Sequence, residues 1–150
     1  MALTNNEELD ILKIVAENPA ISQRKISEQT GISLGQVNFL IKKCAKKGLI
    51  KIEGQTAKSI RYNITPKGMA EKAEKTAEYI RYSYMAVMQL TQVMKEIEDG
   101  HLAEGRKLYV TGDNDELMQI ARLALRPESF HKKEGDNVVT LSPRDFLQYA

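Results

Sequence analysis

The sequence contains a single cysteine, no long hydrophobic run and no cluster of the residue types that hold metals. Cys44 alone cannot form a disulfide within the chain, which favours a reducing compartment. The longest apolar stretch, residues 79–90, is interrupted by Arg81 and Gln89 and is too short to span a bilayer. The first ten residues lack the basic and apolar regions of a secretory signal. These absences predict a cytoplasmic protein with no membrane span and no metal site.

Catalytic residue sets are missing as well. No Ser/His/Asp set, Cys/His set or phosphate-binding loop is present, and neither His101 nor His131 has a partner at metal-ligand spacing. We therefore predict that the protein is not an enzyme and uses no cofactor. Cys44 is expected to be a small buried hydrophobic residue, with redox sensing as the alternative.

Charge is unevenly distributed along the chain. The 150 residues include 22 basic and 20 acidic side chains, a net charge of +2. Residues 1–64 carry 10 basic and 6 acidic side chains, residues 65–150 carry 12 and 14, and residues 24–61 carry 9 and 2. A local excess of seven positive charges predicts a polyanionic partner for the first third of the chain.

The first part of the chain has two helical patterns. Residues 6–18 place apolar side chains at helical spacing, and Asn5 or Asn6 can cap this helix. A second, shorter helix is expected after the N-cap Ser22, and it ends at Gly31, which can adopt the left-handed backbone of a sharp turn.

A third helix and a β-hairpin are expected next. Ser33 can cap a helix over residues 34–47, after which the apolar period changes to two. Strands are predicted at 50–53 and 60–64, on either side of a polar tip at 54–59. The apolar stripe of the third helix comprises Leu34, Val37, Leu40, Ile41 and Cys44.

A long helix begins at Thr65-Pro66, where threonine can cap and proline suits the first helical position. No glycine or proline lies between Gly68 and Gly100, so the helix is expected to run for about thirty residues. Apolar residues three or four apart form a seam that resembles a coiled coil and predicts a homodimer. The seam residues are Ala73, Ala77, Ile80, Tyr84, Val87, Leu90, Met94 and Ile97.

The last fifty residues predict a small α/β module. Strands are expected at 107–111 and 138–141, with a helix at 116–125. The strand–glycine–helix order resembles the start of a nucleotide-binding unit, but Asp113 and Asp115 would repel a phosphate. The expected role of the module is to pack on the long helix, to pair subunits or to bind another protein.

The helix-turn-helix spacing is the most informative pattern in the sequence. With Gln23 as its first position, small Ser27 is fifth, Gly31 is ninth, Val37 is fifteenth and Leu40 is eighteenth. A small residue is needed where the two helices touch, a glycine at the turn, and apolar residues where the second helix rests on the first. Followed by a hairpin, this order predicts a winged helix-turn-helix.

A family resemblance extends this interpretation over residues 5–85. The segments ISQR, ISLG and TPKG, with their surroundings, resemble the MarR-type winged-helix regulators, and within them the exopolysaccharide-associated subgroup. The resemblance implies a dimeric transcription factor that binds double-stranded DNA at a pseudo-palindrome. The predicted fold is α+β, with a winged helix-turn-helix at 1–64, a long dimerisation helix at 65–100 and the α/β module at 101–150.

The expected DNA contacts follow from placing the third helix in the major groove. Base contacts are predicted for Ser33, Gly35, Gln36, Asn38, Phe39 and Lys42, with adenine as the partner of the two amides. Phosphate contacts are predicted for Arg24, Lys25, Lys43, Lys46, Lys47, Lys58 and Arg61.

Alternatives remain open at three places. Phe39 could be a core residue, and the tyrosines and methionines between residues 79 and 94 could line an effector pocket instead of a helix interface. The chain as a whole could also be a protein-interaction module, in which the winged helix and residues 101–150 recruit another protein. A protein partner or a small effector could also bind through residues 79–150.

Overall fold

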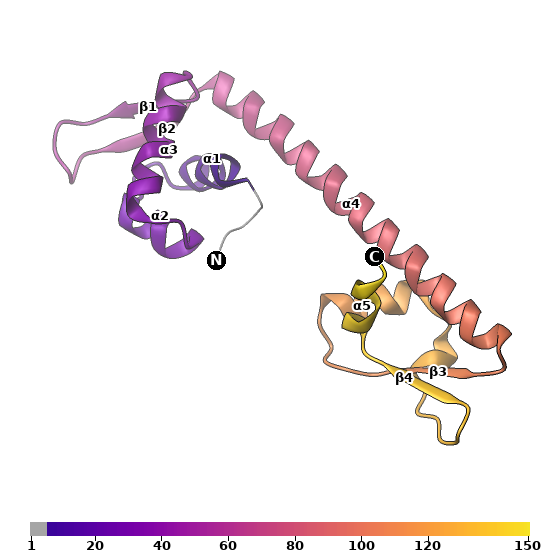
Figure 1. The fold of residues 1–150 in the computed structure, drawn as a ribbon. Coiled ribbons are helices and arrows are strands. Elements are labelled where there is room, and N and C mark those ends of the chain that lie inside the picture. The colour runs from indigo at the N-terminus through magenta and orange to yellow at the C-terminus, as the bar shows by residue number, and fades with distance from the viewer. Residues whose placement is uncertain (1–5) are drawn as a thin grey trace. The chain divides into compact units, whose positions relative to one another are not determined.

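The computed structural model describes residues 6–150 and divides them into two compact units, one ending at Arg81 and the other spanning Tyr82–Ala150. The helix α4, Pro66–Ala103, belongs to both (Figure 1). The predicted α+β class is confirmed, with helices predominating and two separate two-stranded sheets. The division into three functional parts stays a prediction. In the described part of the chain, no helix is both long and apolar enough to cross a membrane.

Three short helices form most of the first unit, and each begins at the residue that the sequence predicts. The N-cap side chains of Asn6, Ser22 and Ser33 each accept a hydrogen bond from a backbone N–H three residues later. Gly31 ends the second helix with a left-handed φ of 74°. Asn5, the alternative first cap, lies outside the described residues. The helices are α1 (Glu7–Glu17), α2 (Gln23–Thr30) and α3 (Leu34–Lys46).

The predicted hairpin is present as β1, Ile50–Glu53, and β2, Arg61–Ile64, paired antiparallel. The core of this unit joins α1, α2 and α3 through apolar side chains of the helices, together with Ile21, Ile32, Leu49, Ile50 and Tyr62 from the connections and the hairpin. One stripe residue was predicted wrongly, because Leu34 lies in the first turn of α3, beyond the core, and is exposed. Cys44 is buried in this core, as expected.

The start of α4 is held by two residues of the TPKG segment. Thr65 Oγ1 accepts a hydrogen bond from the Gly68 N–H at 3.0 Å and donates one to the Gly48 carbonyl at 2.6 Å. Gly68 packs so closely on the residue before β1 that a Cβ atom at Gly68 would lie 2.1 Å from the Leu49 carbonyl oxygen. Only glycine fits this contact.

The end of α4 differs from the prediction. The helix passes through Gly100 without interruption and continues to Ala103. It ends two residues before Gly105, whose φ of 75° allows the Arg106 N–H to reach back to the His101 carbonyl at 2.9 Å. A glycine tolerated inside the helix, and a second glycine that ends it, explain why the helix is longer than predicted.

The second unit is a β-α-β arrangement with two short 3₁₀ turns. The strands β3 and β4 pair parallel, with Lys107 opposite Val138 and Val110 opposite Leu141. This agrees with the strands and helix predicted for the module. Its elements are β3 (Lys107–Val110), α5 (Glu116–Ala124), η1 (Pro127–Phe130), β4 (Val138–Leu141) and η2 (Pro143–Gln148).

Part of the predicted dimer seam belongs to the core of this second unit. Leu90 and Met94 are buried against β3, α5 and η2, and Ile97 packs at the edge of the same cluster. Leu90 and Met94 are therefore not available for another subunit, and their assignment to a dimer interface is corrected. Ile97 is only partly buried, and its assignment stays a prediction. The spacing was read correctly, but the partner is the chain's own C-terminal module.

Candidate nucleic-acid interface

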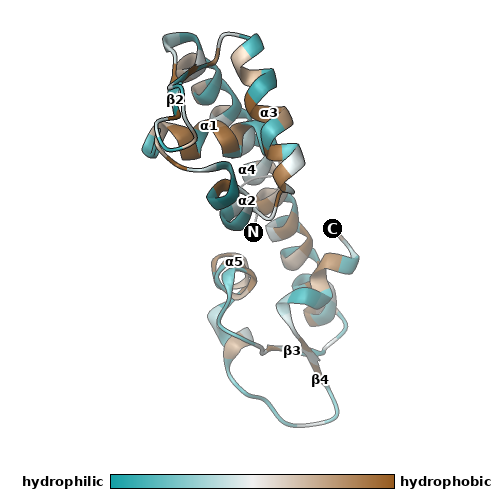
Figure 2. Ribbon diagram, turned by 90° about the vertical axis from the view of Figure 1, so that its left-hand side faces the viewer, coloured by the Kyte–Doolittle hydropathy of each residue, from teal (hydrophilic) through white to brown (hydrophobic). Residues whose placement is uncertain are grey.

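The outer face of α3 carries a continuous exposed stripe of four residues, Gly35, Phe39, Lys42 and Lys46. Their spacings of four, three and four place them on one side of a helix with 3.6 residues per turn. Phe39 is 58% exposed, so the interpretation of Phe39 as a core residue is wrong. Figure 2 shows hydrophobic and hydrophilic residues alternating along α3. The stripe thus combines an aromatic ring with two cations on an accessible helix face.

Gly35 leaves this stripe open at its first turn. A Cβ atom at Gly35 would have no heavy atom within 4 Å, so the fold does not require a glycine there. Gly68, by contrast, is required by packing. Because packing within the protein does not require a glycine at this exposed position, its missing side chain leaves room for the close approach of an outside group.

The two amide side chains of α3 each have one end engaged inside the protein. Gln36 Nε2 donates to Glu7 Oε2 at 3.2 Å, and Asn38 Oδ1 accepts from Gln23 Nε2 at 3.3 Å. Ser33 Oγ caps the helix by accepting from the Gln36 N–H. The sequence pattern marked Gln23 as the first helix-turn-helix position but did not predict its contact with Asn38.

Two of the predicted phosphate contacts are paired internally. Lys47 Nζ lies 3.2 Å from both carboxylate oxygens of Glu8, and Lys43 Nζ lies 3.6 Å from one of them. Glu8 is buried in α1, so these lysines compensate its charge. Their assignment to phosphates is revised for this reason. Periodicity could not reveal the pair, because Glu8 is 35 and 39 residues away in sequence.

The remaining cations are free to meet an outside anion. Lys42 and Lys46 on α3, Arg24 and Lys25 on α2, and Lys58 and Arg61 at the hairpin are all exposed. None of the six forms an ion pair within residues 6–150. They surround α3 on the helix-turn-helix and on the wing.

Cys44 is buried and does not belong to this interface. Burial raises the pKa of its thiol to about 11, and nearby Glu8 adds to the effect, against the opposing influence of Lys47 and Lys43. A buried, protonated thiol is a packing residue and not a redox sensor.

The second unit offers no comparable anion site. Asp115 caps α5 by accepting from the Met118 N–H at 3.0 Å, and its other oxygen lies 3.4 Å from Arg144. A carboxylate therefore occupies the helix start where a nucleotide phosphate would have to bind. Among residues 6–150, no group of three His, Cys, Asp or Glu side chains is arranged to hold a metal ion.

Comparison with known proteins identifies the class of the first unit. Residues 8–51 match the family model of winged helix-turn-helix DNA-binding proteins. A search of curated proteins returned no match. The match covers less than half of the chain and agrees with the winged helix-turn-helix fold of the first unit.

Solved structures with a similar fold include transcriptional regulators. The PcaV transcriptional regulator of Streptomyces coelicolor, solved with its natural ligand, is 15% identical, with a TM-score of 0.50 over 57% of this chain and 62% of PcaV. The transcriptional regulator SlyA is 28% identical (TM-score 0.49; 68% of this chain, 70% of SlyA). A MarR family protein of Mycobacterium tuberculosis, solved with p-aminosalicylic acid, is 17% identical (TM-score 0.45; 55% of this chain, 63% of that protein).

The chain therefore spans less than two thirds of the length of PcaV. The predicted resemblance is confirmed at the level of the fold, which this chain shares with PcaV over 57% of its length. The narrower assignment to the exopolysaccharide-associated subgroup stays a prediction.

Proposed function

We propose that the protein is a sequence-specific DNA-binding transcriptional regulator that inserts α3 into the major groove. The observation that carries the proposal is the exposed stripe Gly35, Phe39, Lys42 and Lys46, surrounded by cations without internal partners. A DNA major groove accepts an α-helix, and its phosphates on either side attract lysine and arginine.

The roles along the stripe follow from its chemistry. Phe39 is large, apolar and exposed, so it suits the methyl group of a thymine. Gly35 allows the helix backbone to approach the base edges. Lys46, Arg24 and Lys58 extend from three elements and suit the phosphates, which fix the register of the protein on DNA without selecting sequence.

A homodimer is the second part of the proposal. The first half of α4 has exposed apolar residues, among them Met69, Ile80, Tyr84 and Met85. Ala73 and Ala77 line a shallow groove of about 380 Å³ beside Ile80, where small side chains permit a second helix to approach. A second copy would cover this face and give the two-fold symmetry that a pseudo-palindromic site requires.

A DNA selection tests the function. Purified full-length protein is mixed with a pool of genomic fragments at two salt concentrations, and the bound fragments are sequenced. The proposal expects one enriched motif with two related halves that survives the higher salt concentration. Weak binding that is equal for all fragments and is lost at higher salt would contradict it.

A second candidate function concerns the C-terminal module. Leu123 on α5 is 82% exposed, and Leu147 and Tyr149 near the chain end are exposed too. Exposed large apolar residues favour a contact with a protein partner or a small effector. Leu123→Glu should leave DNA binding unchanged and abolish any complex formed through this surface, which cross-linking of the full chain in cells would measure. A location in the cytoplasm and the absence of catalysis stay predictions.

A further inference from the structure

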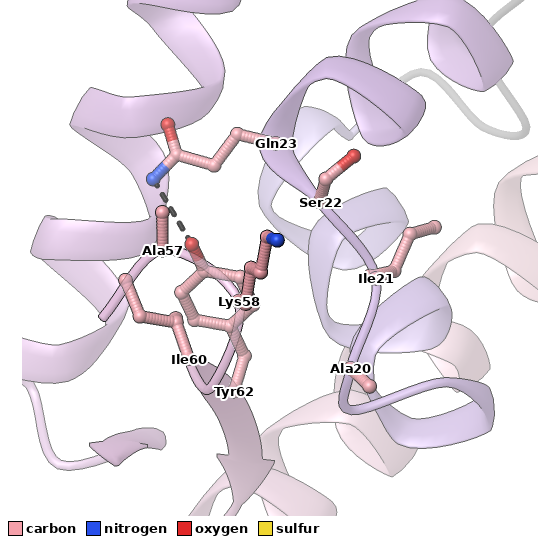
Figure 3. Close-up of a pocket in the computed structure, with 8 residues that line it drawn as sticks. All are labelled: Ala20, Ile21, Ser22, Gln23, Ala57, Lys58, Ile60 and Tyr62. Atoms are coloured by element: carbon pink, nitrogen blue, oxygen red, sulfur yellow. Dashed lines mark hydrogen bonds between the residues drawn. The ribbon is translucent and has the colours of Figure 1, made fainter. Parts of the chain in front are cut away.

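Gln23 connects three parts of the winged helix-turn-helix through one amide nitrogen. Its Nε2 donates to Asn38 Oδ1 on α3 at 3.3 Å and to the Tyr62 hydroxyl on β2 at 3.2 Å. Figure 3 shows the Gln23 side chain reaching from the start of α2 to the tyrosine ring. The first residue of the helix-turn-helix thus links the proposed reading helix to the wing.

The contact is anchored on the wing side. Tyr62 is 5% exposed and belongs to the core of the first unit, and its backbone N–H donates to the Pro19 carbonyl at 2.8 Å. A cavity of about 300 Å³ lies beside Gln23, lined by residues of the α1–α2 connection and of the wing, including Ser22, Lys58 and Ile60. Tyr62 cannot follow Gln23 if Gln23 moves, so it defines where the Gln23 amide sits.

The bond to Gln23 fixes which end of the Asn38 amide faces α2. The carbonyl oxygen accepts from Gln23 through one of its two lone pairs and is held toward it, and the Nδ2 amide group remains as a donor. Paired recognition of adenine requires both a donor and an acceptor from the same amide, whereas guanine presents two acceptors, N7 and O6, in the major groove. Holding the oxygen toward Gln23 therefore favours guanine, which presents only acceptors, over adenine, which presents one acceptor and one donor.

We propose that Gln23 is a positioning residue for DNA recognition, which holds Asn38 with its amide nitrogen toward the groove and so selects guanine over adenine at the base that Asn38 reads. This inference rests on the proposed function, because it specifies how the same helix reads DNA. It replaces the adenine partner that the sequence predicts for Asn38.

Base preference measured with substituted duplexes tests the inference. Starting from the selected motif, each base pair is changed in turn, and the affinities of wild type, Gln23→Ala, Asn38→Ala and the double variant are compared. Gln23→Ala should reduce the preference for guanine over adenine roughly tenfold at one base pair only. In the Asn38→Ala background, Gln23→Ala should change the preference at that base pair no further.

Two controls separate positioning from folding. Gln36→Ala removes the other amide of α3 and should change a different base pair. Tyr62→Phe removes only the hydroxyl anchor and should produce a weaker version of the Gln23→Ala profile. Thermal unfolding of each variant shows whether the fold is retained, and a purely structural effect would lower affinity for all duplexes alike.

The outcomes distinguish the two proposals. If wild type enriches a motif but Gln23→Ala weakens all duplexes equally, or if wild type prefers adenine at the base that Asn38 reads, the role of Gln23 is wrong and the regulator remains. If wild type enriches no motif at all, the proposed function fails and the inference fails with it.

Discussion

The two halves of α4 have apolar residues at the same spacing, but these residues are exposed in the first half and buried in the second. In residues 66–88, Ile80 is 60% exposed and Tyr84 is 63% exposed. In residues 90–103, Leu90 and Met94 are buried, and the carboxylate of Glu98 accepts hydrogen bonds from the Arg126 backbone and from Ser129. The first half has large apolar side chains exposed, whereas the second half forms one wall of a small domain.

The comparison shows what a seam of apolar residues can and cannot indicate. Spacing of three and four identifies the face of a helix that will be covered. It carries no information on whether the cover comes from the same chain or from another copy. The first three predictions below test the two halves.

The largest effect is expected at Met94, which is fully buried in the second unit. Met94→Asp places an unpaired carboxylate in this core and should cost about 3–5 kcal/mol, enough to unfold a small module. Denaturant unfolding followed by circular dichroism should lose the transition of the second unit. Ile80→Asp is the matched change in the exposed half, and equal destabilisation by both would contradict the comparison.

The double variant Ile80→Asp/Val87→Asp should break the homodimer without unfolding the chain. Two carboxylates on the exposed half would have to be desolvated in any helix pair, so self-association should weaken at least a hundredfold. Sedimentation velocity at micromolar concentration measures this change. A wild-type protein that already sediments as a monomer under these conditions would remove the basis of the dimer proposal.

Glu98→Gln removes a buried charge of the second unit. Arg126 Nη1 lies 3.0 Å from Glu98 Oε2 and 2.9 Å from an Asp99 oxygen, so one of its two anionic partners would be lost. We expect a loss of about 2 kcal/mol, the typical value for a buried hydrogen bond to a charged group. Thermal unfolding measures it, and Glu96→Gln, an exposed change two residues away, should have no measurable effect.

The smallest effects contrast two glycines of the first unit. Gly68→Ala forces a Cβ onto the Leu49 carbonyl and should destabilise the first unit by about 1–2 kcal/mol. Gly35→Ala meets open space and should raise stability by up to about 1 kcal/mol. The same Gly35→Ala variant should bind DNA more weakly, because its methyl group faces the groove. A Gly35→Ala protein with unchanged DNA affinity would show that close approach at this position is not needed.

Much of the fold was predictable because local rules determine it. The caps at Ser22 and Ser33, the turn at Gly31 and the alternation in the hairpin all act within a few residues. The end of α4 was not predictable from such local rules. A helix interior tolerates Gly100 when no other residue ends the helix there, and it is Gly105 that adopts the left-handed conformation after the helix end.

The candidate site was only partly predictable for a related reason. The exposed stripe of α3 follows from periodicity, but its polar side chains have partners from distant parts of the sequence. Lys43 and Lys47 form ion pairs with Glu8, and the Asn38 carbonyl oxygen accepts a hydrogen bond from Gln23. Such pairings depend on how α1 and α2 pack against α3, which the sequence of α3 alone does not contain.

Four lysines of α3 provide the most direct test of the DNA-binding account. Lys42→Ala/Lys46→Ala removes two charges without internal partners, and Lys43→Ala/Lys47→Ala removes two charges that are paired with Glu8. The measurement is the affinity of each full-length variant for the selected duplex over a range of salt concentrations. The account predicts that the first pair weakens binding and reduces the slope of log affinity against log salt by roughly two, whereas the second pair leaves the slope unchanged. Equal changes of slope for the two pairs would contradict the claim that the exposed stripe of α3 faces DNA.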